Sequence, residues 1–304
     1  MKQTHSFVYT RYGVFDRLIT EVRLGKPHDI LPLDATARTP PIGKYNAIWD
    51  TGAGRTYISP TLFCTLALNK LKPLDYDPGD GVPTEIFIRL PDTLDVPKFR
   101  VFVKELDLEM EKVDMVLGMD IIRNGDFFLS HFHGKMSFAF SSPHMFNCLF
   151  KPVMGYSFYE HHKFVDLAIR TPIAIQAVSK TKGLLSPIIS ADKSSGPIYA
   201  LLDTGRVQSC VSKELLPELG LLLGPKGQVY NVNIELLSGK VMIPSLNVTA
   251  RTLRAGISLL LGMDVIKSSD FIITRPADDL CAFFCYPPNA PFDIVTWLED
   301  PEEL

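Results

Sequence analysis

Two copies of the tripeptide DTG stand out in this sequence, because each places a carboxyl group directly after an apolar run. The first begins at Asp50 in "YNAIWDTGAGRTYIS", and the second begins at Asp203 in "IYALLDTGRVQSCVS". A carboxylate activates water for attack on a peptide carbonyl only if a second group supplies a proton to the oxyanion and the leaving amine. Two carboxyl groups that share one proton meet this need, since like charges at close range do not both ionise readily. Asp50 and Asp203 are therefore candidates for a catalytic pair.

The residues that follow each Asp suit a tight turn beside buried carboxyl groups. Gly52 and Gly205 permit the φ angles of such a turn and let backbone amides approach the carboxylates. Thr51 and Thr204 offer hydroxyl groups that could lock two loops together. A buried carboxyl pair has to be oriented by hydrogen bonds of this kind.

A second motif repeats in the same order as DTG. "VDMVLGMDIIRNGDFFLS" follows the first DTG, and "ISLLLGMDVIKSSDFIIT" follows the second. The two DTG aspartates are 203 − 50 = 153 positions apart, and the LGMD glycines, Gly118 and Gly262, are 262 − 118 = 144 positions apart. The order DTG, LGMD, DTG, LGMD indicates an internal duplication, although a duplication can preserve packing without any chemistry.

Short apolar runs bounded by Gly, Pro, Asp and Asn predict a mostly β chain. Helical patterns are brief: "SPTLFCTLAL" and "SKELLPELGL" each open on a Ser that could cap a helix, and "MDIIRNG" and "MDVIKSS" predict short turns. We expect a first half-domain over residues 1–145, a connecting segment over 146–178 and a second half-domain over 179–304.

Composition and charge narrow the classes of function. A chain of 304 residues, 46% hydrophobic and 21% charged, can bury a substantial core. The net charge of −3 and the lack of a basic run give no reason to expect a nucleic-acid partner. No stretch approaches the roughly 18 apolar residues of a membrane span, and the five scattered cysteines do not resemble a secreted disulfide framework. We therefore expect a cytoplasmic protein with no membrane partner.

Other residues with reactive side chains favour structural roles. His131 and His133 would share one face of a strand, but no third metal ligand lies nearby in the sequence. The adjacent His161 and His162 would point to opposite sides of an extended chain. Cys210 lies close to the second DTG, yet no histidine lies near it in sequence to activate a thiol. The sequence therefore predicts no metal and no cofactor.

Taken together, the two motifs resemble those of the retropepsin-like aspartic protease family. The family pattern of two apolar residues, DTG, a small residue and an apolar strand is matched by "IWDTGAGRTYIS" and less well by "LLDTGRVQSCVS". Its apolar-apolar-Gly pattern is matched by "VLG" and "LLG". The resemblance implies two tandem β-barrel half-domains with short helices, related by a pseudo-two-fold axis. One chain would then replace the usual homodimer.

The resemblance also implies an activity and a substrate. An aspartic endopeptidase of this family hydrolyses peptide bonds with a water activated by its Asp pair, here Asp50 and Asp203, and binds an extended polypeptide. Thr51 and Thr204 would form the grip between the two loops. The candidates for the cleft wall and for the flaps that close over it are Ala53, Arg206, Gly79, Gly81, Gly224 and Gly227.

Two departures from the family pattern leave alternatives open. Met119 and Met263 stand where retroviral members often place Arg, so the chain looks closer to the cellular branch. Arg206 stands where the family prefers Ala, Ser or Thr. Its side chain either faces the cleft, where it would lower the pKa of the Asp pair and select acidic substrate side chains, or points outward to a carboxylate of the protein.

These alternatives correspond to three hypotheses of function. The first is an active endopeptidase. The second is a catalytically impaired pseudoprotease that binds a peptide or protein without cutting it, because of Arg206. The third is a scaffold that has no peptide-sized cleft.

Overall fold

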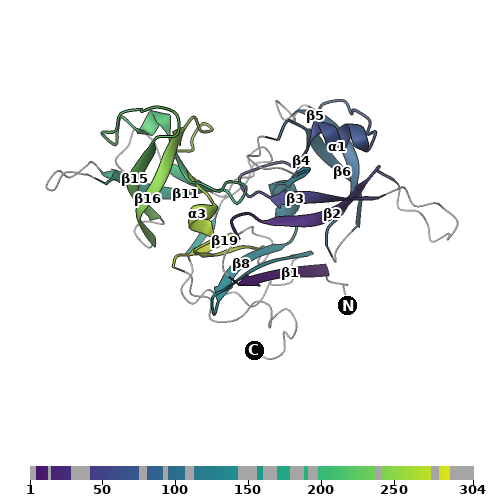
Figure 1. Ribbon diagram of the computed structural model, residues 1–304, viewed down its shortest axis with the longest axis horizontal. Helices are drawn as coiled ribbons and strands as arrows, with labels where there is room; N and C mark the ends of the chain where they lie inside the picture. Colours follow the sequence, from purple (N-terminus) through teal and green to yellow (C-terminus); the bar gives the residue numbers. More distant parts are fainter. Residues whose placement is uncertain are drawn as a thin grey trace.

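In the computed structural model, two lobes stand on a shared sheet (Figure 1). The residues that the structure describes are 5–12, 15–28, 42–74, 81–91, 95–106, 113–142, 156–159, 170–178, 188–190, 198–236, 241–274 and 281–287. These residues are mostly in β-strands, with short helices, as the sequence predicts.

The first lobe is a closed barrel with the strand order β2-β3-β7-β4-β6-β5. Its strands are β2 (Ile19–Gly25), β3 (Gly43–Trp49), β4 (Tyr57–Ile58), β5 (Val82–Arg89), β6 (Asp95–Val103) and β7 (Met115–Leu117). Alternate residues of β2 face the interior, as expected for a strand with one buried side. Helix α1 (Pro60–Thr65) follows β4, and the Ser59 hydroxyl caps it by accepting a hydrogen bond from Leu62 N–H at 3.1 Å.

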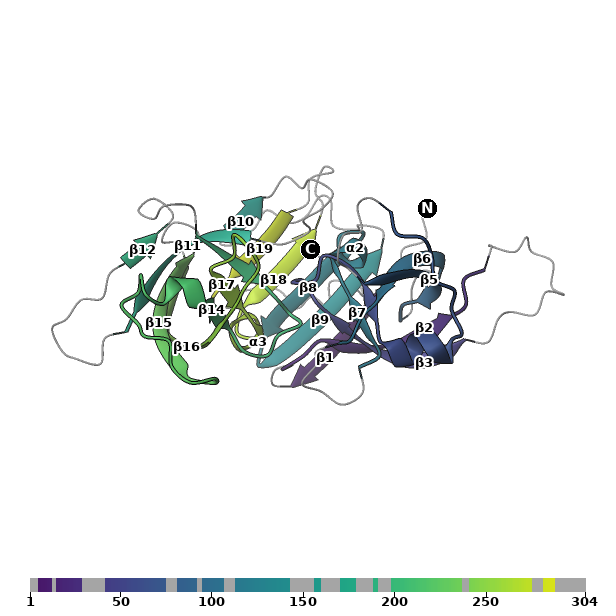
Figure 2. The ribbon, with the colours of Figure 1, turned by 90° about the horizontal axis from the view of Figure 1, so that it is seen from above.

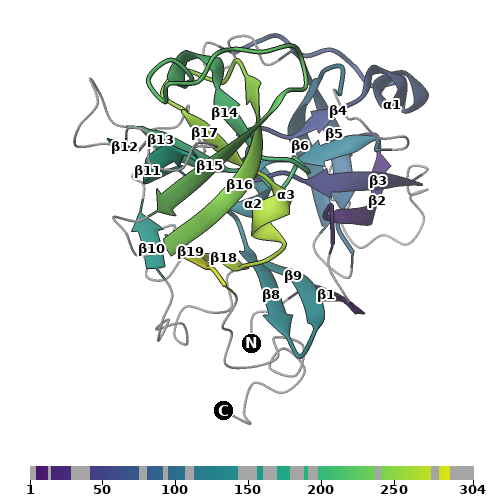
Figure 3. The same cartoon turned by 60° about the vertical axis from the view of Figure 1, so that its left-hand side comes forward.

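The second lobe repeats the strand pairings of the first. Its sheet has the order β12-β11-β13-β17-β14-β16-β15, and β15 also pairs with β11, which closes a ring of six strands. The strands are β11 (Arg170–Ala177), β12 (Ile188–Ser190), β13 (Tyr199–Leu202), β14 (Cys210–Ser212), β15 (Val229–Leu236), β16 (Val241–Arg251) and β17 (Leu259–Leu261). Both lobes contain a central parallel pair, β3 with β7 and β13 with β17. Figure 3 brings β15 and β16 of this lobe to the front.

The expected helix in "SKELLPELGL" is only the 3-10 helix η1 (Lys213–Leu215), followed by turns. Two physical reasons account for this. Pro217 has no N–H to bond the Lys213 carbonyl, so an α-helix cannot continue through it. The Ser212 hydroxyl donates to the Glu214 carboxylate instead of capping the backbone.

The shared sheet joins the two lobes. Its order is β1-β9-β8-β18-β19-β10, and β8 and β18 pair antiparallel at its centre. The strands are β1 (His5–Tyr12), β8 (Asp126–Phe132), β9 (Lys135–Ser142), β10 (Tyr156–Tyr159), β18 (Asp270–Thr274) and β19 (Cys281–Cys285). Phe128 lies opposite Ile272 in the central pair. Seen from above, β9, β8, β18 and β19 lie side by side between the lobes (Figure 2).

Strands β10 and β11 fall in the range 146–178, which the sequence assigns to a connecting segment. β10 pairs with β19 as β1 pairs with β9, and β11 pairs with β13 and β15 as β2 pairs with β3 and β5. This range therefore contributes to both the shared sheet and the second barrel. The half-domain boundaries themselves stay a prediction.

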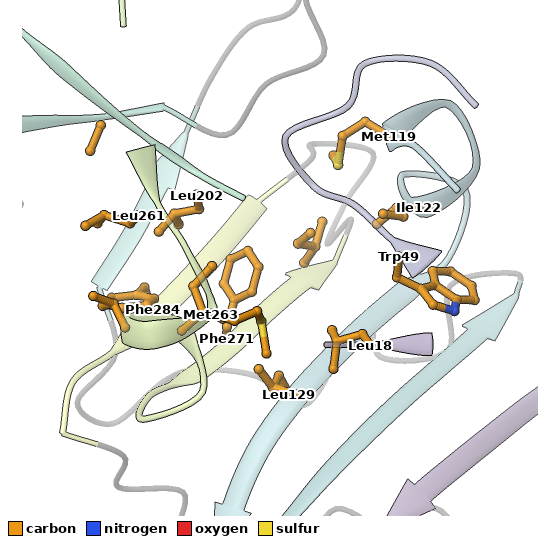
Figure 4. Packing of buried hydrophobic residues seen from close by; sticks show 14 of the residues in the cluster. Leu18, Trp49, Met119, Ile122, Leu129, Leu202, Leu261, Met263, Phe271 and Phe284 are labelled. Atoms are coloured by element: carbon orange, nitrogen blue, oxygen red, sulfur yellow. The ribbon is translucent and has the colours of Figure 1, made fainter. Parts of the chain in front are cut away.

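One continuous hydrophobic core runs behind both DTG loops. Figure 4 shows residues from both halves packed in it, among them Trp49 and Leu129 from the first and Leu202 and Phe271 from the second. Trp49 is fully buried, and its indole N–H donates to the Thr20 hydroxyl at 3.0 Å. Burial of such a side chain stabilises the fold by about 1.5–3 kcal/mol. The strand ends that precede the two aspartates are therefore held rigidly.

Candidate active site

Asp50 and Asp203 occupy equivalent positions at the ends of β3 and β13. The Asp50 N–H donates to the Leu117 carbonyl at 3.0 Å, and the Asp203 N–H donates to the Leu261 carbonyl at 3.0 Å. These bonds extend the parallel pairs by one residue beyond each strand. Each Asp is thus fixed by the strand that precedes its LGMD motif.

The two aspartates meet across the boundary between the lobes. Each carboxyl group lies close enough to the other to affect its pKa. A methyl group at Gly52 would overlap the Asp203 carboxyl, and one at Gly205 would overlap the Asp50 carboxyl. Only glycine fits at either position, because each loop places its glycine against the opposite Asp.

Thr51 and Thr204 lock the loops together with four reciprocal hydrogen bonds. The Thr51 hydroxyl donates to the Leu202 carbonyl at 2.8 Å and accepts from the Thr204 N–H at 3.1 Å. The Thr204 hydroxyl donates to the Trp49 carbonyl at 2.7 Å and accepts from the Thr51 N–H at 3.1 Å. Both threonines are fully buried. The predicted contact between the loops is therefore present in the structure.

The two carboxyl groups differ in their surroundings. Asp50 Oδ1 accepts from the N–H groups of Gly52 at 2.8 Å and Ala53 at 3.0 Å. Asp203 Oδ1 accepts from the Gly205 N–H at 2.9 Å, while the Arg206 N–H donates to the Asp203 backbone carbonyl at 3.4 Å. The Asp50 carboxylate is therefore the better stabilised of the two.

This difference decides where a shared proton resides. Burial raises the pKa of Asp203 well above its ordinary range, and the charge of Asp50 and the hydrogen bond between them raise it further. Burial also raises the pKa of Asp50, but the hydrogen bond from Asp203 and the two backbone donors oppose the rise. Burial therefore favours a pair that keeps one proton, and the additional backbone donor at Asp50 favours the ionised form of that carboxyl group.

A hollow of about 190 Å³ opens beside the pair. Asp50 and Gly205 lie in its wall, together with Ala53 and Arg206, which the sequence predicts for the cleft. Several further residues of the wall were not predicted for the cleft: Arg17, Tyr57, Lys104, Glu105, Leu106, Val116 and Val207. The volume is below the roughly 300–1,000 Å³ of a pocket for a drug-sized ligand, so it suits part of a larger substrate.

The predicted flap glycines differ in where they lie relative to the hollow. Gly81, with φ of 106°, lies against the backbone of Val103 and next to Lys104, which lines the hollow. Gly224 and Gly227 are not among the residues that line it. Gly79 lies outside the described residues. The flap assignment therefore stays a prediction.

The LGMD aspartates have a role that the sequence did not reveal. Asp120 accepts from Thr56 N–H at 2.9 Å and from the Thr56 hydroxyl at 2.6 Å. Asp264 accepts from Ser209 in the same way, at 2.9 Å and 2.6 Å. Burial raises the pKa of Asp120, and the Thr56 hydrogen bonds oppose the rise. A signal was present, since a hydroxyl residue stands six positions after each DTG Asp.

These bonds tie each DTG loop to the short helix that begins at the Met of LGMD, α2 (Met119–Ile122) or α3 (Met263–Ile266). The Met119 N–H donates to the Ala53 carbonyl at 2.8 Å, and the Met263 N–H donates to the Arg206 carbonyl at 2.7 Å. The backbone at Ala53 and Arg206 is therefore fixed by the residue that opens each short helix.

Within the described ranges, no group of three or more His, Cys, Asp or Glu side chains could hold a metal ion. No helix in this part of the chain combines the length and apolarity needed to cross a membrane.

Comparison with solved structures relates this arrangement to a known fold. The aspartic proteinase from Irpex lacteus matches with a TM-score of 0.50 over 95% of this chain and 99% of that chain, at 11% sequence identity. This chain has the fold of an aspartic proteinase. Conglutin gamma, a basic 7S globulin from lupine seeds, matches with a TM-score of 0.46 over 90% of this chain and 96% of that chain, at 10% identity. No protein-family model and no curated protein matches the sequence.

The aspartic proteinase fold agrees with the expected pair of β-barrel lobes and short helices. At such low identity, the likeness concerns the fold alone. The case for an activity therefore depends on the chemistry of the Asp50 and Asp203 pair.

Proposed function

We propose that this protein is an aspartic endopeptidase of the retropepsin-like type, cytoplasmic and without a cofactor, whose internally duplicated chain replaces a homodimer. The observation that supports the proposal is the reciprocal packing of the two DTG loops, in which each glycine lies against the opposite Asp and the two threonines interlock. The unequal surroundings of the two carboxyl groups give them different roles.

The roles follow from where the proton resides. Ionised Asp50 takes a proton from a water molecule as the water oxygen bonds to the peptide carbonyl carbon. Protonated Asp203 gives its proton to the carbonyl oxygen, so the tetrahedral intermediate is neutral and the pair keeps one proton. Transfer of the proton from Asp50 to the amide nitrogen then allows the C–N bond to break. The intermediate returns a hydroxyl proton to Asp203, and the pair recovers its starting state.

The substrate is proposed to be an extended polypeptide. The hollow beside Asp50 accommodates only part of a ligand, and its wall comes from both lobes. A chain that crosses the boundary between the lobes would bring one peptide bond to the carboxyl pair. Side chains on either side of that bond would then contact Tyr57 and Val116 of one lobe and Val207 of the other.

Cleavage of a peptide library across a range of pH tests this proposal. Loss of either carboxyl group should lower the rate at least about 100-fold, because general acid–base catalysis contributes about 10²–10⁴-fold. Asp50→Asn and Asp203→Asn are the variants, and Glu21→Gln, on the exposed face of β2, is the control for loss of a carboxylate. Turnover by Asp50→Asn at the rate of the unaltered protein would show that other groups perform the chemistry.

One observation favours a second candidate, a pseudoprotease that binds a peptide or protein without cutting it. Arg206 lines the hollow, and its positive charge opposes the burial that raises the pKa of both aspartates. Loss of the shared proton would leave no acid for the reaction. Binding of library peptides without cleavage at any pH would support this candidate over the protease.

A further inference from the structure

Arg206 is held at the rim of the carboxyl pair by its own backbone. Its N–H donates to the Asp203 carbonyl at 3.4 Å, and its carbonyl accepts from the Met263 N–H at 2.7 Å. The residue is half-buried and lines the same hollow as Asp50. Burial raises the pKa of Asp50 and of Asp203, and the charge of Arg206 opposes the rise in both. The guanidinium therefore acts on the interior of the hollow.

No carboxylate of the described chain forms an ion pair with Arg206. Other cations do have such partners: Lys44 pairs with Glu21 at 2.9 Å, and Lys267 pairs with Asp16 at 2.8 Å. The outward alternative, in which Arg206 points to a carboxylate of the protein, therefore has no support among the described residues.

The two positions directly after the DTG motifs differ in charge. Ala53 occupies the equivalent position after the first DTG and has a small, neutral side chain. Lys104, which also lines the hollow, makes a cation–π contact: its ammonium lies 5.2 Å from the centroid of the Tyr57 ring. Arg206 is thus the cation of the wall that directly follows a DTG motif.

Among the described residues, Arg17, Lys104 and Arg206 bring positive charge to the wall of the hollow, and Asp50 and Glu105 bring negative charge. A ligand that brings a carboxylate would complement the charge of Arg206.

We propose that Arg206 is a specificity-determining residue that selects polypeptides with an Asp or Glu side chain next to the scissile bond. The inference rests on the proposed function, because it assumes that the substrate occupies this hollow. A carboxylate matches the planar fork of a guanidinium and accepts two parallel hydrogen bonds from it, which Gln and Asn cannot reproduce with equal strength.

The same contact explains how the chemistry proceeds beside a cation. A substrate carboxylate that pairs with Arg206 reduces the field of the guanidinium on Asp50 and Asp203. The shared proton is then retained when an acidic substrate is bound. The choice of substrate and the retention of the shared proton therefore both depend on Arg206.

Matched peptides test the inference. Each pair of peptides differs only in Glu or Gln at one position near the cleaved bond, and kcat/KM is measured for both. We expect the unaltered protein to prefer Glu by about 10-fold or more, since a hydrogen bond to a charged group is among the stronger ones. Arg206→Gln should bring the ratio close to one, and Arg206→Lys should retain part of it. Arg254→Gln, at an exposed site outside the hollow, is the matched control and should leave the ratio unchanged.

A binding measurement separates this inference from the proposed activity. Asp50→Asn keeps Arg206 but lacks one carboxylate of the pair, so fluorescence anisotropy of labelled Glu and Gln peptides reports selection without turnover. Preferential binding of Glu peptides that Arg206→Gln abolishes would support selection even if no peptide is cleaved. Asp203→Asn serves for the same measurement if Asp50→Asn does not fold. An equal preference for Glu peptides in Arg206→Gln and in the unaltered protein would overturn the inference. A uniform rise in the cleavage of all peptides by Arg206→Gln would also overturn it, because it would show that Arg206 is inhibitory.

Discussion

The interlocked threonines allow a quantitative test of how the two loops are held together. Replacement of Thr51 by Val keeps nearly the same shape but removes the hydroxyl group. The bond to the Leu202 carbonyl at 2.8 Å and the bond from the Thr204 N–H at 3.1 Å are both lost. Because the site is fully buried, water cannot replace the missing hydroxyl, and both backbone groups are left unsatisfied.

The expected loss follows from these two bonds. A net hydrogen bond contributes about 0.5–1.5 kcal/mol, and a buried group left without a partner costs about 1–3 kcal/mol. We therefore expect Thr51→Val to lower the free energy of unfolding by about 2–4 kcal/mol. Thr204→Val should cost a similar amount, because its hydroxyl also makes two buried bonds.

Urea unfolding followed by far-UV circular dichroism measures this loss from the midpoint and slope of the transition. Thr65→Val is the matched control, because the Thr65 hydroxyl donates to the Thr61 carbonyl at 2.9 Å on an exposed helix. This control should change the free energy of unfolding by less than about 0.5 kcal/mol. A loss in Thr51→Val no larger than that of the control would refute the argument that the buried grip stabilises the fold.

Two further predictions concern the pKa of Asp203 and the packing of the LGMD glycines. Burial, together with the charge of Asp50, raises the pKa of Asp203 above its ordinary value of 3.8, so the folded protein holds a proton that the unfolded chain releases. The free energy of unfolding should therefore fall as the pH rises from about 4 toward the raised pKa. Urea titrations at several pH values measure this fall, and it should be shallower in Asp203→Asn. An equal dependence on pH in both proteins would contradict the prediction. Gly118→Ala places a methyl group against the Arg55 carbonyl and should lower the midpoint of thermal unfolding more than Gly262→Ala, whose nearest contact would be 2.9 Å; equal midpoints would show that the loop shifts freely.

The sequence predicts the parts of the site that are local and repeated. The apolar run, the Asp and the glycine of each DTG loop stand next to one another, so their shared position at the end of β3 and β13 follows from the pattern alone. The contact between Asp120 and Thr56 joins residues 64 positions apart, and only the folded chain shows that they meet.

The other features that the sequence does not predict also depend on the folded chain. Arg17 and Lys104 reach the hollow through the path of the barrel, and nothing in their local sequence marks them as lining residues. β10 and β11 lie outside both motifs, so their place in the sheets depends on distant partners such as β19 and β15. The turn after Ser212 differs from the expected helix because a single proline outweighs the surrounding helical pattern.

Asp50 and Asp203 belong to one continuous polypeptide, whose two halves are joined by the pairing of β8 with β18. Their encounter is therefore intramolecular, and an effective concentration governs it instead of the amount of protein present. A pair assembled from two separate chains would come apart on dilution, whereas this one remains complete in an isolated molecule. Each copy of the protein carries its own complete carboxyl pair, even when only a few copies are present.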